Sequence, residues 1–545
     1  DYCYVSDGRL ICASGPGRER SYGWNEAGLI ETVRDADGVV EARNCYDDTG
    51  RVIEQTSVLG RVSRYVYLPG GVTVVSDGDG TRANTWITDR RGRLVGIIDA
   101  DDRRQSMGYD RWGNLVLATE RDGSVTVTEY DERGRKAKQV LASGARLEWS
   151  YDPHGRVVET SVTNEGEQQA RTVFSYDEGS RNPGMSVDPA GGVTRMAWDR
   201  GLLTEVVDPT GVRVRFGYDE HGDLITSMDA DGNTARLERD ASGRVIAAVT
   251  PLGHRTRYHY NEAGLLTERV DPDGAAWTYE HTRGGKVCAV IDPLGGRTEI
   301  EYGDHGLRER VIDPLGRGIA TYYDDLGNLA QVALPDGVTW EFGYDASSRL
   351  RKAVDSTGGE WVWSYDANGQ VSGTTDPTGV QRQIQRGPLG FPTQLTDGED
   401  STSAGYDRLG RVISVAGPDG RPSLHRYDLC GRLVETVDPE GAVTSFERDA
   451  AGRVVSVTQP MGGTFGYEYD ACGRWVATVS TGGDRYELGY DADGRVTAET
   501  WPTGEQVSTT FDACGRVIER VQPGRGVTKF RYDKCGHIIE VNDPW

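Results

Sequence analysis

The sequence has few apolar residues and no long apolar run. Hydrophobic residues make up 36% of the 545 residues, against roughly 45–50% in typical globular proteins, so a thick packed core is not expected. No segment approaches the roughly 18 consecutive apolar residues of a transmembrane helix. The first 20 residues also lack the basic start and apolar stretch of a signal peptide. We therefore expect no membrane span, and any export must use another route or an N-terminal segment that this sequence lacks.

Lysine is scarce, and positive charge is nowhere concentrated. The chain has 85 acidic and 61 basic residues, hence a net charge of −24, and no Lys/Arg run of the kind that binds a phosphate backbone. A nucleic-acid partner is disfavoured. Only six of the basic residues are lysine, so 55 are arginine. Because the guanidinium fork pairs with carboxylates in a planar, bidentate way that lysine cannot copy, this bias predicts a fixed structural use of arginine.

Glycine is abundant, with 73 residues, and its positions reveal a repeat. The pattern is an aromatic residue, Asp, two variable residues, Gly and usually Arg, as in Tyr151-Asp152-Pro153-His154-Gly155-Arg156. From Tyr4 to Tyr532 we find 26 copies with a mean spacing of 21.1 residues. One repeat, from Tyr151 to Tyr176, is 25 residues long, and we expect its extra residues within 164–169. Clear copies begin at Tyr406, Tyr427, Tyr469, Tyr490, Phe511 and Tyr532, and weaker ones at Trp24, Trp198, Arg239, Tyr260, His281, Arg386 and Arg448.

A second turn signal follows each first one by roughly ten residues. It reads Asp-Pro-x-Gly, as in Asp208-Pro209-Thr210-Gly211, which is what a type I turn prefers because Pro presets φ and the Asp side chain caps the turn. The segments between turns alternate with period two: Val212, Val214 and Phe216 lie on one face. Each repeat is therefore predicted to be two strands and two turns. We call the two kinds of turn the first turn and the second turn, and number their positions from the Asp.

The fold class predicted is all-β, with residues 1–545 forming a single repeat array. Twenty-six hairpins are about 52 strands, or a sheet about 250 Å wide at roughly 4.8 Å per strand. Open twisted sheets rarely exceed about ten strands without curling or splitting. Because strand twist accumulates in one direction and apolar residues are few, we expect one continuous sheet wound into a hollow spiral shell.

The repeat closely resembles the tyrosine–aspartate (YD) repeat of the Rhs family of bacterial polymorphic toxins, which also occurs in toxin-complex C proteins, cell-wall-associated proteins and teneurins. The resemblance covers nearly all of the chain. It implies a β-sheet cocoon that encloses a toxin domain carried at the C-terminus of the same chain. The family's aspartyl self-cleavage core has no counterpart before Trp545, so we expect this chain to be a segment of a longer one.

The function expected is a non-enzymatic shell that sequesters a toxin or other polypeptide cargo for delivery. Its partners would be the enclosed polypeptide and a secretion or injection apparatus. The alternative is a surface or wall-associated adhesive protein that binds glycans through exposed aromatic side chains. Trp149, Trp277, Trp340, Trp361 and Trp363 suit that alternative, but they recur with the strand register, which favours a ladder of aromatic side chains between hairpins.

No catalytic, cofactor or metal site is predicted. Cys430, Cys472, Cys514 and Cys535 all occupy the third position of a first turn, but neighbouring hairpins place that position about 10 Å apart, too far for a disulfide or a shared zinc ion. His154, His221 and His305 share the position, which we interpret as a tolerant, exposed turn position. Cys3, Cys12 and Cys45 do not follow the repeat spacing, and a disulfide between two of them stays an open alternative. The acidic clusters at residues 77–80 and 229–233 are interpreted as turns rather than calcium loops, since neither has the ligand pattern of a twelve-residue calcium site.

Overall fold

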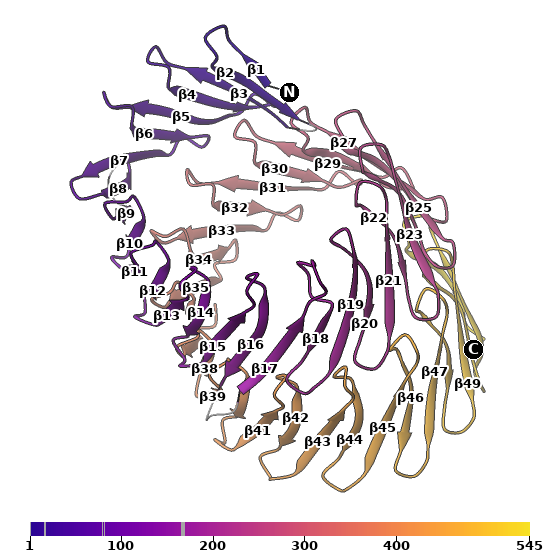
Figure 1. The fold of residues 1–545 in the computed structure, drawn as a ribbon. Coiled ribbons are helices and arrows are strands. Elements are labelled where there is room, and N and C mark those ends of the chain that lie inside the picture. The colour runs from indigo at the N-terminus through magenta and orange to yellow at the C-terminus, as the bar shows by residue number, and fades with distance from the viewer. Residues whose placement is uncertain (1, 16–17, 79, 81, 165–168, 545) are drawn as a thin grey trace. The chain divides into compact units, whose positions relative to one another are not determined.

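The computed structural model describes residues 2–15, 18–78, 80, 82–164 and 169–544. Within these residues the chain forms 52 strands and no helix (Figure 1). The all-β prediction is therefore confirmed, as is the prediction of two strands in every repeat. No helix in the described part of the chain is long and apolar enough to cross a membrane.

The first 26 strands are β1 (Tyr2–Tyr4), β2 (Leu10–Gly15), β3 (Arg18–Trp24), β4 (Ile30–Asp35), β5 (Val40–Tyr46), β6 (Val52–Ser57), β7 (Val62–Leu68), β8 (Val72–Asp77), β9 (Ala83–Thr88), β10 (Leu94–Ile98), β11 (Arg104–Tyr109), β12 (Leu115–Thr119), β13 (Val125–Tyr130), β14 (Lys136–Val140), β15 (Arg146–Tyr151), β16 (Val157–Thr163), β17 (Gln169–Ser175), β18 (Met185–Val187), β19 (Val193–Asp199), β20 (Leu202–Val207), β21 (Arg213–Tyr218), β22 (Leu224–Met228), β23 (Thr234–Arg239), β24 (Val245–Val249), β25 (Arg255–Tyr260) and β26 (Leu266–Val270).

The other 26 are β27 (Ala276–His281), β28 (Val287–Ile291), β29 (Arg297–Tyr302), β30 (Arg308–Ile312), β31 (Gly318–Tyr323), β32 (Leu329–Ala333), β33 (Thr339–Tyr344), β34 (Leu350–Asp355), β35 (Glu360–Tyr365), β36 (Val371–Thr375), β37 (Gln381–Arg386), β38 (Pro392–Asp397), β39 (Asp400–Tyr406), β40 (Val412–Ala416), β41 (Pro422–Tyr427), β42 (Leu433–Val437), β43 (Val443–Arg448), β44 (Val454–Thr458), β45 (Thr464–Tyr469), β46 (Trp475–Ser480), β47 (Arg485–Tyr490), β48 (Val496–Thr500), β49 (Gln506–Phe511), β50 (Val517–Gln522), β51 (Gly526–Tyr532) and β52 (Ile538–Asn542).

Neighbouring strands along the chain pair antiparallel, so the ladder passes from hairpin to hairpin. Strand β21, for example, pairs with β20 on one side and with β22 on the other. The register of β21 with β22 shifts between Gly217 and Tyr218, and the same bulge recurs at the aromatic residue of most repeats, as at Tyr427 and Tyr490. Each bulge ends the regular ladder where the first turn begins.

The two kinds of turn have the same backbone geometry. In the first turn, Gly155 donates a hydrogen bond to the Asp152 carbonyl (3.0 Å) and Asp152 donates one to the Arg156 carbonyl (2.9 Å). In the second turn, Gly211 and Asp208 make the equivalent bonds at 3.0 and 2.9 Å. The glycines have φ values of 86° and 94°, a left-handed conformation that other residues rarely adopt. This requirement explains the fixed glycine at the fourth position.

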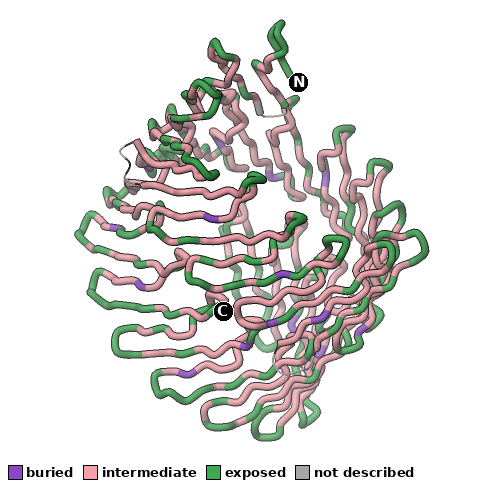
Figure 2. The backbone as a smooth tube through the Cα atoms, turned by 60° about the vertical axis from the view of Figure 1, so that its left-hand side comes forward, coloured by how far each residue is buried: buried purple, intermediate pink, exposed green. Residues whose placement is uncertain are grey.

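The strands have no thick core beneath them. Among the described residues no large side chain is fully buried, and the buried apolar residues are seven alanines and Val507. Most strand residues are half-buried, whereas the turns are largely exposed (Figure 2). The sheet is therefore a single layer with two accessible faces, as the low apolar content predicts.

Contacts divide the chain into two compact units. Unit 1 comprises residues 1–135, 260–268 and 277–401, and unit 2 comprises residues 136–259, 269–276 and 402–545. Each unit thus combines an early and a late stretch of the same repeat array. That residues 1–545 form one continuous repeat array stays a prediction. Of the 164–169 stretch expected to hold the additional residues of the long repeat, residues 165–168 lie outside the described part of the chain.

Candidate functional site

The conserved letters of the first turn form one hydrogen-bonded network. The Asp152 carboxylate accepts hydrogen bonds from the Arg156 backbone amide (2.9 Å) and from Arg156 Nε (2.6 Å). The same carboxylate–guanidinium pair occurs at Asp428–Arg432 and Asp491–Arg495. The predicted structural pairing of the repeated Asp and Arg is confirmed. The planar guanidinium of Arg156 donates to the carboxylate through Nε. Lysine has no such planar group, so it could not replace the arginine fully.

The tyrosine of each first turn ties its hairpin to the preceding one. The hydroxyl of Tyr218 donates to the carbonyl of Leu203 (2.8 Å), fifteen residues earlier. Tyr344 and Tyr469 repeat this bond to Leu329 and Val454. The same spacing is kept at Tyr302, Tyr365, Tyr427, Tyr490 and Tyr532. The aromatic ladder is thus a set of polar links as well as ring contacts.

Arginines that replace the tyrosine preserve this link. Arg448 donates from one terminal nitrogen to the Leu433 carbonyl (2.9 Å), again fifteen residues earlier, and from the other to the Gly452 carbonyl (3.0 Å). Arg386 makes the same pair of bonds to Val371 and Gly390. The copies that look weak in sequence are therefore structurally equivalent, because the guanidinium supplies the donor that the phenol would supply.

In many repeats the arginine of the first turn also stacks on the aromatic ring of the next repeat. Arg411 lies 5.0 Å from the ring centroid of Tyr427, and Arg453 lies 4.8 Å from that of Tyr469. Among the tryptophans, the rings of Trp340 and Trp361 are 4.9 Å apart. Trp149, Trp277, Trp340, Trp361 and Trp363 are all half-buried, as a ladder predicts and an exposed sugar-stacking platform does not.

In unit 2, second turns contact first turns that lie far along the chain. Arg474 binds Asp231 (2.9 Å) and Arg516 binds Asp273 (2.8 Å), with 243 residues between the partners in each case. Arg453 also donates to Thr210 Oγ1 (2.8 Å) across the same spacing. We call such contacts between second and first turns the seam. The aspartates and the threonine occupy the third position of second turns, and their partners are the repeated arginines of first turns.

Unit 1 has an equivalent seam with a slightly longer spacing. Asp101 binds Arg349 (2.7 Å, 248 residues apart), and Asp122 accepts a hydrogen bond from Asn368 (2.7 Å, 246 residues apart). The path from Asp101 to Arg349 includes the 25-residue repeat, whereas the path from Asp231 to Arg474 does not. Most of the difference between the two spacings follows from that one repeat.

The seam corrects the interpretation of the cysteine position as a tolerant, exposed one. Cys430, Cys472 and Cys514 are half-buried, and Cys472 and Cys514 make hydrogen bonds to Asp231 and Asp273 across the seam. His154 and His221, at the same turn position, are exposed. Sequence spacing along one hairpin row could not reveal this difference, since the facing turn is about 240 residues away.

A metal-like cluster in the seam is better explained by hydrogen bonds. Ligand atoms of Asp229, Asp231 and Cys472 lie within 4.8 Å of one another. However, Asp229 accepts bonds from the Asn233 backbone and side chain (2.8 and 2.9 Å), and Asp231 is paired with Arg474. Burial and the hydrogen bond to Asp231 raise the pKa of the Cys472 thiol to about 11. The free thiol is therefore protonated at neutral pH, which makes it a poor nucleophile. In the 77–80 cluster, Asp77 accepts bonds from Arg61 at 2.6 and 2.9 Å, whereas Asp79 lies outside the described residues.

Of the three N-terminal cysteines, one pair lies close enough to form a disulfide. Cys3 of β1 lies directly opposite Cys12 of β2, and the Cys12 thiol donates to Cys3 Sγ at 2.8 Å. Cys45 lies on β5, three strands from β2 and so about 14 Å away.

We expect oxidised glutathione to convert Cys3 and Cys12 into a disulfide, because directly opposite residues satisfy the Cα separation that the bond requires. The cysteine pair would lose two protons and two electrons, and one glutathione disulfide would become two thiols. A thiol titration under denaturing conditions should then fall from eight to six per chain. Trypsin cuts after Arg9, so mass spectrometry can identify the linked peptides. Cys45→Ser should still lose two thiols, and Cys3→Ser none; an oxidised pair that includes Cys45 would contradict the assignment.

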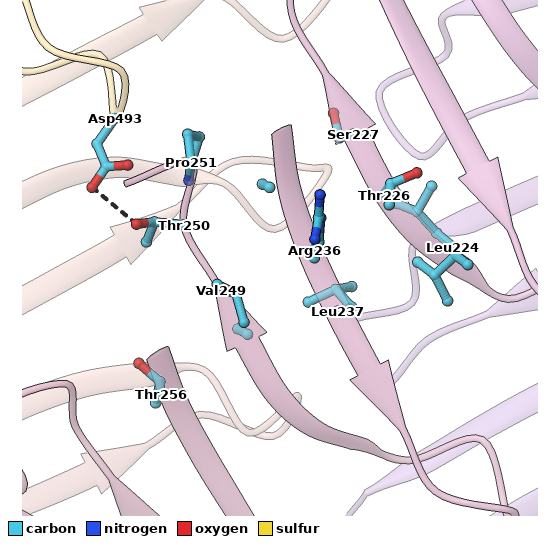
Figure 3. Close-up of a pocket in the computed structure, with 13 residues that line it drawn as sticks. Leu224, Thr226, Ser227, Arg236, Leu237, Val249, Thr250, Pro251, Thr256 and Asp493 are labelled. Atoms are coloured by element: carbon cyan, nitrogen blue, oxygen red, sulfur yellow. Dashed lines mark hydrogen bonds between the residues drawn. The ribbon is translucent and has the colours of Figure 1, made fainter. Parts of the chain in front are cut away.

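A cavity of about 440 Å³ opens in unit 2 beside the seam. Its walls come from β22, β23, β24 and β25, and Asp493 lies at its edge (Figure 3). The Asp493 carboxylate is fully engaged: it accepts hydrogen bonds from Thr250 Oγ1 and the Leu252 amide (both 3.0 Å) and lies 3.3 Å from His254 Nδ1. Among the described residues that line the cavity, Asp493 is the one carboxylate.

Comparison with protein families agrees with the repeat. A family model described as "RHS Repeat" matches residues 89–145, 197–298 and 323–360 in overlapping copies. A second model, described as "Teneurin YD-shell", matches residues 389–543. Together the two models match repeats between residues 89 and 543.

Curated relatives include proteins named as toxins. A probable deoxyribonuclease RhsB of Dickeya dadantii is 28% identical over 273 residues, which is 45% of this chain and 17% of the relative. The toxin protein Tse5 of Pseudomonas aeruginosa is 29% identical over 40% of this chain and 17% of its own length. The matched part is thus less than a fifth of either relative.

Solved structures share the fold. A crystal structure of TcdB2-TccC3 has a TM-score of 0.69 at 14% identity and covers 99% of this chain and 38% of that one. The structure of the Photorhabdus luminescens Tc holotoxin pore has a TM-score of 0.65 at 13% identity, covering 100% and 39%. At these identities the likeness concerns the fold alone.

Proposed function

Since the chain belongs to the Rhs/YD-repeat family, whose repeats form shells in toxin proteins, we propose that it forms part of the wall of a non-enzymatic shell. The shell encloses a toxin or other polypeptide until delivery. The observation that carries the proposal is the single-layer sheet. No large side chain in the described residues is fully buried, so the sheet encloses no core of its own. Both of its faces are free to meet solvent or a second polypeptide.

The chemistry of the conserved residues supports a wall rather than an enzyme. The Tyr, Asp and Arg of the repeats are joined to one another and to backbone carbonyls, which leaves none of them poised for catalysis. The deoxyribonuclease name among the relatives belongs to a protein of which this chain matches a small part. We therefore assign such activities to the cargo, and delivery to a secretion or injection apparatus.

The seam provides a way to test enclosure. In the natural protein that contains residues 1–545, the cargo should resist a protease that cuts it readily when the cargo is isolated. Replacing Asp231 and Asp273 together with arginine sets like charges against Arg474 and Arg516, and we expect cargo cleavage to become at least about tenfold faster. The control is Asp48→Arg, which changes charge at an exposed position of a first turn.

Three results would contradict the proposed shell or the role of the seam in closing it. Equal cleavage of enclosed and isolated cargo would remove the protective role. Equal acceleration by Asp48→Arg would assign the effect to charge rather than to the seam. Glycan binding by a chain that protects no polypeptide would favour the adhesive alternative.

A further inference from the structure

The cavity of unit 2 is lined by small side chains at a position where some other repeats carry tryptophan. Ala235 of β23 and Thr256 of β25 line it, and they stand at the same position of successive repeats, 21 residues apart. Continuing in steps of 21 residues, that position holds Trp277, Thr298, Ile319, Trp340 and Trp361. Three of these five following repeats thus carry an indole ring at the position where Ala235 and Thr256 line the cavity.

Strand register shows that the small residues lie on one face of the sheet. Ala235 lies opposite Ser227 of β22, and Thr256 lies opposite Ala248 of β24. In the repeats with tryptophan, Trp340 lies opposite Val332 and Trp361 opposite Ala353 in the same way. The two hairpins thus present small side chains where other hairpins carry rings.

The stacked pair elsewhere in the chain indicates what would fill the space. Trp340 and Trp361 occupy consecutive copies of this position, with ring centroids 4.9 Å apart. At the corresponding place in the cavity, Leu237 and Ile225 supply aliphatic walls. Hydroxyl groups come from Thr226, Ser227, Thr250 and Thr256, and Arg236 also lines the cavity. Asp493 is already bonded to Thr250 and Leu252. A ring with little need for hydrogen bonds suits this lining better than a sugar does.

We propose that the cavity is a binding site for an aromatic side chain of a bound polypeptide. An incoming indole or phenyl ring would occupy the space between Ala235 and Thr256 that the tryptophans of other repeats fill from within. As a contact for enclosed cargo the site rests on the proposed function, but its preference for an aromatic ring is a property of unit 2 alone and can be tested without cargo.

The probe is N-acetyl-tryptophanamide, observed by saturation-transfer NMR with the whole chain. We expect saturable binding with a millimolar Kd, as suits a single side chain without a peptide. Ala235→Trp should reduce the transfer by about tenfold, because the new indole fills the cavity as Trp340 fills its own position. Thr256→Trp should do the same. Circular dichroism verifies that each variant is folded.

Thr298→Trp is the matched control. Thr298 holds the same repeat position, half-buried on β29, but does not line the cavity. Its variant should bind the probe like the parent chain. The proposal is overturned if all three variants weaken binding equally, if neither cavity variant weakens it, or if N-acetylglucosamine competes better than the tryptophan derivative. Cargo that stays protease-resistant in Ala235→Trp would leave enclosure intact, so the two proposals fail separately.

Discussion

Asp407→Ala is expected to lower the local stability of unit 2 by about 3 kcal/mol, because removing one member of a buried charge pair leaves the charge of the other uncompensated. The Asp407 side chain is 4% exposed. Its carboxylate accepts hydrogen bonds from the Leu409 amide, Arg411 Nε and Asn164 Nδ2 at 2.9, 2.5 and 2.9 Å. Burial alone would raise the pKa of Asp407, but the bonds from Arg411 hold it below its ordinary value. The substitution removes all of these acceptors together and leaves the Arg411 guanidinium without its carboxylate.

Hydrogen exchange is the suitable measurement, since long repeat arrays do not unfold in one step. Amides of β39 and β40, on either side of this turn, should exchange about a hundredfold faster, which corresponds to about 3 kcal/mol. Arg411→Lys should have a smaller effect, because lysine retains the charge but neither the fork nor the stacking on Tyr427. Asp47→Ala alters the same turn position where the arginine is 52% exposed, and its effect should be smaller still. Equal effects of Asp407→Ala and Asp47→Ala would refute the role of burial.

Acidification is expected to unfold the chain over a narrow range that begins near pH 4. Burial alone would raise the pKa values of Asp345 and Asp428, but hydrogen bonds from Arg349, Arg432 and turn amides hold them below the ordinary value. The turn aspartates Asp152, Asp240 and Asp313 are shifted in the same direction. A carboxyl whose pKa is depressed on folding stabilises the fold fully above its unfolded pKa of about 3.9, and this stability is lost as the pH falls through the folded value.

The measurement is far-UV circular dichroism together with urea midpoints between pH 7 and pH 2. The midpoint should stay nearly constant from pH 7 to about pH 5 and then decline steeply below pH 4, because many equivalent turns protonate together. A decline that is already complete above pH 5 would contradict a leading role of the turn carboxylates. A midpoint that is flat down to pH 3 would mean that the turn carboxylates contribute little.

The local structure could be predicted because its contacts lie within about one repeat. Asp152 reaches Arg156 four residues away, and Tyr218 reaches Leu203 fifteen residues away. Alternation, turn residues and the 21-residue period therefore suffice for strands, turns and ladder. The arginines at the tyrosine position were counted as weak copies, although their ability to donate to the same carbonyl could have been inferred from their chemistry.

The seam could not be predicted, because its partners are set by the twist summed over many hairpins. A small change in twist per strand would bring Arg474 opposite a different second turn from that of Asp231. The half-burial of Cys472 follows from the seam and was missed with it. The cavity was different: aligning the repeats places Ala235 and Thr256 in a column with Trp277, so the sequence did contain that signal.

The spacing of the seam determines when its halves can meet during synthesis. At roughly 5–20 residues per second, the 243 residues between Asp231 and Arg474 take on the order of 12–50 s to translate. Hairpins form within about 1–10 μs, so the second turn of Asp231 is complete long before its partner exists. Charged and hydroxyl side chains such as Asp231, Asp273 and Thr210 keep the row of second turns hydrated until its partners are synthesised. They thereby discourage association between nascent chains. The late-forming salt bridges then close each unit only after the ribosome has supplied the facing row.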